Sequence, residues 1–154
     1  MGSRATRAIV RIAAVATYSP QLLDHFEHPR NVGEVAQPDA CAEVENPACG
    51  DIMRLSLKLE DGRIAQARFR TRGCVPSIAC GSALTEMLLG KSVTEARALR
   101  REELVAAVGG LGNASQHASH LAMDALAATL RELPARETPS ASPASNRTTP
   151  KTID

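Results

Sequence analysis

The sequence predicts an α+β fold, in which a small antiparallel sheet carries helices on one face. Apolar and polar residues alternate along 52–60 and 63–72, as they do in half-buried strands. Asp61 and Gly62, between these two segments, are typical of a hairpin turn. After residue 77 the pattern changes to helical spacing. Because the strands come first and the helices afterwards, we expect α+β rather than an alternating arrangement.

Cap residues and breaks in the pattern predict the other elements. Ser19 and Pro20 are typical of a helix start, and Pro29 is expected to end that helix. Residues 40–46 are expected to form a short edge strand. The residues expected to face the helices are Met53, Leu55, Leu57 and Leu59 in the first hairpin strand and Ala65, Ala67 and Phe69 in the second. Further helices are expected at 77–89, 93–99, 101–108 and 114–133.

The ends of the 154-residue chain differ in composition from its middle, so we expect one domain at 18–133. Residues 1–17 are basic and predict a disordered leader, an over-long start or a mitochondrial transit peptide. Residues 134–154 are rich in Pro, Ser and Thr and predict a disordered tail. We expect a cytoplasmic protein, or one of the mitochondrial matrix if the leader is a transit peptide.

Composition argues against several classes of partner. The 18 basic and 17 acidic residues nearly balance, and there are only three aromatic residues, so a nucleic-acid surface is not expected. The apolar runs are too short to span a bilayer, so no membrane partner is expected. Four cysteines in a chain of this length do not make a disulfide scaffold, which leaves thiols for metal or redox chemistry.

Two of the cysteines are predicted to meet at one end of the hairpin. Cys49 and Asp51 precede its first strand, and Cys74 follows its second strand just before a helix. Since the first strand starts where its antiparallel partner stops, all three should lie close together. A helix N-terminus should also stabilise the Cys74 thiolate and lower its pKa.

The last predicted helix can add a nitrogen ligand. His117, His120 and Asp124 recur there at helical spacing. We expect His117, near the helix start, to join the two cysteines and Asp51, and we expect His120 and Asp124 to be surface or partner-facing residues. Two sulfurs, a carboxylate and an imidazole form a mixed set that suits zinc or iron.

Several segments together resemble one family, the NifU-like (IscU-type) iron–sulfur cluster assembly scaffolds. The resemblance covers 18–130 in unbroken order, through "YSPQLLDHFEHPRNVG", "NPACGD", "ARFRTRGC", "ALTEMLLGKS" and "HASHLAMDAL". It implies a three-stranded antiparallel sheet with packed helices. It also implies a labile [2Fe–2S] cluster, or a single Fe²⁺ or Zn²⁺, held by residues at the positions of Cys49, Asp51, Cys74 and His117.

The resemblance further implies partners and a role. A cysteine desulfurase would supply sulfur, and apo iron–sulfur proteins would receive the cluster. The chain would then be a scaffold and not an enzyme, and whether it forms a homodimer stays open. Alternatives are a zinc-bound sulfur acceptor that activates a desulfurase, a metal-dependent hydrolase, and a degenerate member of the family that only binds partner proteins.

The chain departs from the family pattern at two places. Ala118 stands where the family has a third ligand cysteine directly after the histidine, and "GLGNAS" replaces the Pro-Pro-Val-Lys stretch presented to a dedicated Hsp70 chaperone. Cys80 is an additional thiol, which either replaces the lost ligand or packs as a small apolar residue. The ligand role requires the helix to start near Ser77, as Pro76 suggests, so that Cys80 lies in its first turn. Cys41, in the edge strand, is expected to be structural or incidental.

Overall fold

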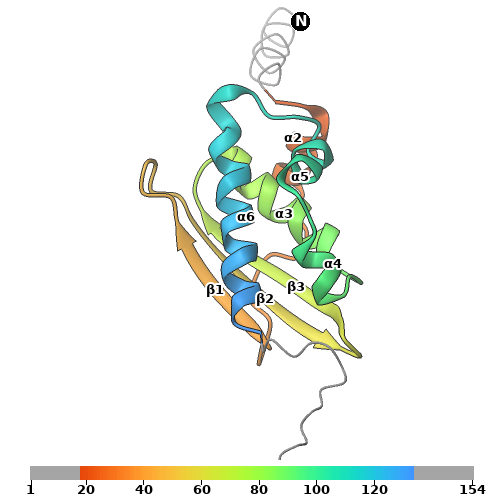
Figure 1. Ribbon diagram of the computed structural model, residues 1–154. Helices are drawn as coiled ribbons and strands as arrows, with labels where there is room; N and C mark the ends of the chain where they lie inside the picture. Colours follow the sequence, from red (N-terminus) through yellow and green to blue (C-terminus); the bar gives the residue numbers. More distant parts are fainter. Residues whose placement is uncertain (1–17, 134–154) are drawn as a thin grey trace, which may run out of the picture.

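The computed structural model describes residues 18–133, so the predicted leader and tail lie outside the described residues. Within this range a three-stranded sheet is packed against helices, which confirms the α+β prediction (Figure 1). The elements in chain order are α2 (Pro20–Glu27), β1 (Ala40–Glu45), β2 (Ile52–Glu60), β3 (Arg63–Arg72), α3 (Val75–Leu88), α4 (Val93–Arg97), α5 (Arg101–Ala107), the 3₁₀ turn η1 (Asn113–Ser115) and α6 (Gln116–Arg131).

The sheet has the order β1-β2-β3, and both pairs of neighbouring strands are antiparallel. The hairpin turn between β2 and β3 lies at the predicted place, with positive φ angles of 54° at Asp61 and 78° at Gly62. This conformation is the one in which a two-residue turn matches the twist of its strands. At the other end of the hairpin, Ile52 at the start of β2 pairs with Arg72 at the end of β3. The loops that carry the predicted ligands therefore lie at one end of the sheet.

The prediction that Ala65 of β3 faces the helices is wrong. Ala65 is exposed, whereas Ile64 is buried together with Ala67 and Phe69. The register shifts beside Lys58 and Leu59, so that one more residue is present on β3 than on β2 at this point. Such a β-bulge reverses the inward and outward faces of the residues on either side, and simple alternation does not anticipate it.

Helices α3 and α6 cover one face of the sheet (Figure 1). Met53, Leu55 and Leu57 of β2 are fully buried beneath them, as predicted. Helix α3 is buried along most of its length, because α2 and α6 also pack against it. None of the helices within 18–133 is long and apolar enough to cross a membrane.

Helix α3 begins two residues earlier than predicted, with Cys74 as its N-cap and Pro76 in its first turn. Proline is tolerated there because the first N–H groups of a helix have no intrahelical partner. The earlier start corrects the expectation that Cys80 lies in the first turn, because Cys80 becomes the sixth helical residue.

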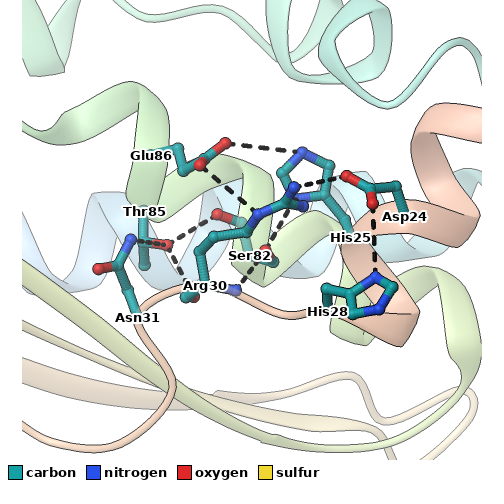
Figure 2. Close-up of polar contacts among 8 residues, drawn as sticks. All are labelled: Asp24, His25, His28, Arg30, Asn31, Ser82, Thr85 and Glu86. Atoms are coloured by element: carbon teal, nitrogen blue, oxygen red, sulfur yellow. Dashed lines mark hydrogen bonds and ion pairs between the residues drawn. The ribbon is translucent and has the colours of Figure 1, made fainter.

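A polar network fastens α2 and the segment after it to α3 (Figure 2). His25 Nδ1 lies 2.7 Å from Ser82 Oγ and 3.0 Å from Arg30 Nη1, so it accepts hydrogen bonds as a neutral ring. Burial and the neighbouring Arg30 guanidinium lower the pKa of His25, which agrees with the neutral form. Arg30 also pairs with Asp24 and Glu86. The N-terminal part of the fold is thus joined to α3 by polar contacts as well as by the buried Leu22.

We predict that Gly81→Ala destabilises the protein, although alanine is the better helix former by about 1 kcal/mol. A Cβ at Gly81 would lie 2.4 Å from the Phe69 ring, where α3 packs on β3. Overpacking of this kind costs about 1–3 kcal/mol. Denaturant unfolding measures the difference, and the cost should shrink in a Phe69→Leu background. An increase in stability on Gly81→Ala would contradict the close packing.

Candidate metal centre

The turn between β1 and β2 presents Cys49 to solvent. The backbone N–H groups of Cys49 and Gly50 both donate to the Asn46 carbonyl, at 3.2 and 2.6 Å, and Ala48 N donates to the Asn46 side chain. Gly50 has a φ of 80°, a left-handed conformation that glycine adopts without strain. The turn is therefore closed by its own hydrogen bonds, which leave the Cys49 thiol exposed.

Asp51 lies at the centre of the site and is only 8% exposed. Its Oδ2 accepts hydrogen bonds from Ser77 Oγ at 2.7 Å, from Cys74 Sγ at 3.2 Å and from Cys74 N at 3.3 Å. Burial alone would raise the pKa of Asp51, but these hydrogen bonds, with one from Cys49, outweigh burial and keep the pKa below its usual range. The carboxylate is therefore ionised at neutral pH, as a metal ligand must be.

Cys74 is the N-cap residue of α3, and its own side chain caps no N–H group. The sequence led us to expect a lowered thiol pKa from the helix N-terminus, and this expectation is wrong. Burial raises the pKa of Cys74, and the adjacent Asp51 carboxylate raises it further, which outweighs the hydrogen bonds from Ser77. A cation bound at the site would reverse this balance because it favours the thiolate.

His117 comes from the first turn of α6 and points at the same place. Its Nε2 lies 3.5 Å from Cys74 Sγ and 3.9 Å from Asp51 Oδ2. One ligand atom from each of Cys49, Asp51 and His117 falls within 4.8 Å of the others. The structure thus brings Cys49, Asp51, Cys74 and His117 together. Two sulfurs, one oxygen and one nitrogen, partly open to solvent, fit an iron or zinc ion or the iron atoms of a cluster.

Cys80 lies apart from these four residues. It is fully buried in the hydrophobic core, and burial raises the pKa of its thiol to about 12. Metal ligation requires a thiolate, which burial disfavours at Cys80. A ligand role for Cys80 stays a prediction, and it would require Cys80 to leave the core. The packing role is the one that this placement favours.

The other residues discussed from the sequence lie outside the group formed by Cys49, Asp51, Cys74 and His117. Ala118, in the family's third-cysteine position, is fully buried on α6. Cys41 is half-buried on β1, and burial raises the pKa of its thiol. His120 and Asp124 are exposed and line a pocket together with His117.

Sequence reasoning missed two residues of the site. Ser77 donates the shortest hydrogen bond to Asp51, and a Cβ at Gly73 would lie 2.6 Å from Asp51 Cγ. The signal for Ser77 was its position one helical turn after Cys74, which places the two side chains on one face. The signal for Gly73 was weaker, since a glycine beside a ligand has many explanations.

A comparison with protein-family models decides the family. The model of the NifU-like N terminal domain matches residues 17–139, which include every residue of the site. The chain belongs to this family. Among curated NifU-like relatives, the iron-sulfur cluster assembly scaffold protein IscU 1 of Archaeoglobus fulgidus is 44% identical over 109 residues, covering 71% of each chain.

Further relatives agree with this assignment. The iron-sulfur cluster assembly scaffold protein IscU of Escherichia coli K12 is 40% identical over 119 residues, covering 75% of this chain and 92% of that one. The crystal structure of a NifU-like N-terminal domain from Brucella abortus superposes with a TM-score of 0.63 at 22% identity, over 78% of this chain and 96% of that chain. The structural likeness supports the fold of the NifU-like domain.

We predict that Gly73→Ala weakens metal binding by this NifU-like domain, because the added Cβ occupies the space of the Asp51 carboxylate. Titration of the apo-protein with Co²⁺ measures the affinity, and circular dichroism checks the fold. Gly112→Ala is the matched control, since a Cβ there would meet nothing within 4 Å. Equal affinities for the two variants would contradict the close approach of Asp51 to Gly73.

Proposed function

We propose that this protein is a scaffold on which a nascent [2Fe–2S] cluster is assembled and from which it passes to apo-proteins. The observation that carries the proposal is the meeting of Cys49, Asp51, Cys74 and His117 at one open end of the sheet. Membership of the NifU-like family agrees with this role. The cluster is cargo in this proposal, so the site should bind it and also release it.

The ligand set suits temporary binding. Iron–sulfur clusters are held most firmly by thiolates, and four of them would keep the cluster in place. Here an oxygen and a nitrogen ligand stand beside two sulfurs, and hard oxygen is the poorer match for cluster iron. Asp51 is therefore the ligand expected to leave first.

Cys49 is the residue suited to receive sulfur. Its thiol is exposed on a turn, whereas Cys74 is half-buried and Cys80 is fully buried. In the proposed step the Cys49 thiolate attacks the outer sulfur of a persulfide on a cysteine desulfurase. A new S–S bond forms on Cys49, and the desulfurase cysteine leaves as its thiolate. The turn carries Cys49 at the surface, where a docked partner can reach it.

A permanently zinc-bound sulfur acceptor is the alternative, because the same donor set suits zinc. Anaerobic reconstitution with iron and sulfide separates the two functions. A scaffold acquires a visible-absorbing cluster and passes it to an apo-ferredoxin. A protein that keeps zinc, acquires no cluster and still stimulates a desulfurase would support the alternative and overturn the scaffold.

We predict that Cys49→Ser and Cys74→Ser each lose most of the iron and sulfide bound after reconstitution, whereas Cys41→Ser retains them. Cys41 is the matched control, since it lies on β1 and is not one of the four candidate ligands. Cys80→Ser decides between the two roles of Cys80. If Cys80 packs in the core, this variant is less stable towards denaturant but still binds iron and sulfide. If Cys80 is a ligand, its loss of cluster matches that of Cys74→Ser.

We predict that Asp51→Ala slows release of the cluster, because the variant lacks the ligand that should dissociate first. The rate of transfer to an apo-ferredoxin, followed by circular dichroism, measures release from protein that has been fully loaded. Transfer by Asp51→Ala at the wild-type rate would show that another ligand controls release.

A further inference from the structure

We propose that Ser77 is a positioning residue of the metal centre, which holds the Asp51 carboxylate in the orientation that ligation requires. This inference rests on the proposed function, because it concerns a residue that supports the same site. Ser77 is fully buried in the first turn of α3, and its hydroxyl donates to Asp51 Oδ2 at 2.7 Å. The same hydroxyl oxygen lies 3.3 Å from Cys74 Sγ.

The hydrogen bond from Ser77 holds the Asp51 carboxylate in an orientation that suits metal ligation. With this hydrogen bond in place, Asp51 offers an oxygen within 4.8 Å of the Cys49 and His117 ligand atoms. Gly73 closes the other side, since a side chain there would displace the carboxylate. Asp51 is thus confined between a glycine without a side chain and a buried hydroxyl. This arrangement selects one position of the carboxylate.

Ser77 is the closest of the donors to the Asp51 carboxylate. From the first turn of α3, Asp51 Oδ2 accepts hydrogen bonds from Ser77 Oγ at 2.7 Å, from Cys74 Sγ at 3.2 Å and from Cys74 N at 3.3 Å. Cys74 is itself a candidate ligand, so Ser77 is the side-chain donor among these three that a substitution can remove without removing a ligand.

Removal of a group that hydrogen-bonds to a metal ligand and orients it typically lowers metal affinity by about 10–100-fold. We therefore expect Ser77→Ala to weaken Co²⁺ binding to the full-length apo-protein about tenfold or more. The absorption bands of the bound Co²⁺ should also shift, since the carboxylate contributes to its ligand field. A role in folding alone would leave those bands unchanged.

A double-mutant cycle separates positioning from a general effect on the fold. If Ser77 acts through Asp51, Ser77→Ala costs little further affinity in an Asp51→Ala background. The matched control is Ser82→Ala, which removes another buried hydroxyl from α3 where it contacts His25 and Arg30, away from the site. Ser82→Ala should lower thermal stability and leave Co²⁺ affinity unchanged.

Three results would overturn the role of Ser77. They are wild-type Co²⁺ affinity in Ser77→Ala, an equal loss with and without Asp51, and an equal loss in Ser82→Ala. If Ser77→Ala does not fold, Ser77→Thr and Ser77→Val replace it. These two side chains have the same shape as each other, and only threonine keeps the hydroxyl, so only the valine variant should lose affinity. Failure of the wild type to bind Co²⁺ or to acquire a cluster would instead refute the proposed function and, with it, the role of Ser77.

Discussion

The contact between the Asp51 carboxylate and the first turn of α3 joins the sheet to the helical layer at the candidate metal centre. Asp51 comes just before β2, whereas Cys74 and Ser77 belong to the start of α3, more than twenty residues later. An anion at a helix N-terminus satisfies N–H groups that lack an intrahelical partner and interacts favourably with the helix dipole. The Cys74 side chain caps no N–H group, and Asp51 accepts the backbone N–H of this N-cap residue while also being a candidate ligand.

This double role explains the local chemistry of the site. Burial raises the pKa of Cys74, and the hydrogen bond that its thiol donates to Asp51 raises it further, because a carboxylate beside a thiol disfavours the thiolate. The same hydrogen bond helps to keep the pKa of Asp51 low. The sequence prediction considered the helix dipole at Cys74 and not its neighbouring anion. Position along the chain was sufficient to predict that the two residues meet, but the resulting pKa depends on burial and on the direction of each hydrogen bond.

The fold was largely predictable because its signals are local. The boundaries of β2 and β3 follow from their alternation, and the turn at Asp61 and Gly62 follows from its residue types. Convergence of Cys49, Asp51 and Cys74 follows from antiparallel pairing alone. Ala65 was misplaced because a bulge changes the register without a clear mark in the sequence, and the start of α3 was misplaced because Pro76 fits into a first turn. Depth of burial, which governs Cys80, depends on all the elements packed around α3.

The complete burial of Ala118 has a consequence for how the ligand set can change during evolution. Ala118 lies on α6 within the same hydrophobic core as Cys80 on α3, and both side chains are fully enclosed. A cysteine at position 118 would enlarge a fully enclosed side chain, and overpacking of a core typically costs about 1–3 kcal/mol. A single substitution that introduced the family's third cysteine would therefore weaken the fold unless neighbouring core residues became smaller. The packing between α3 and α6 therefore opposes a change of the candidate ligand set at this position.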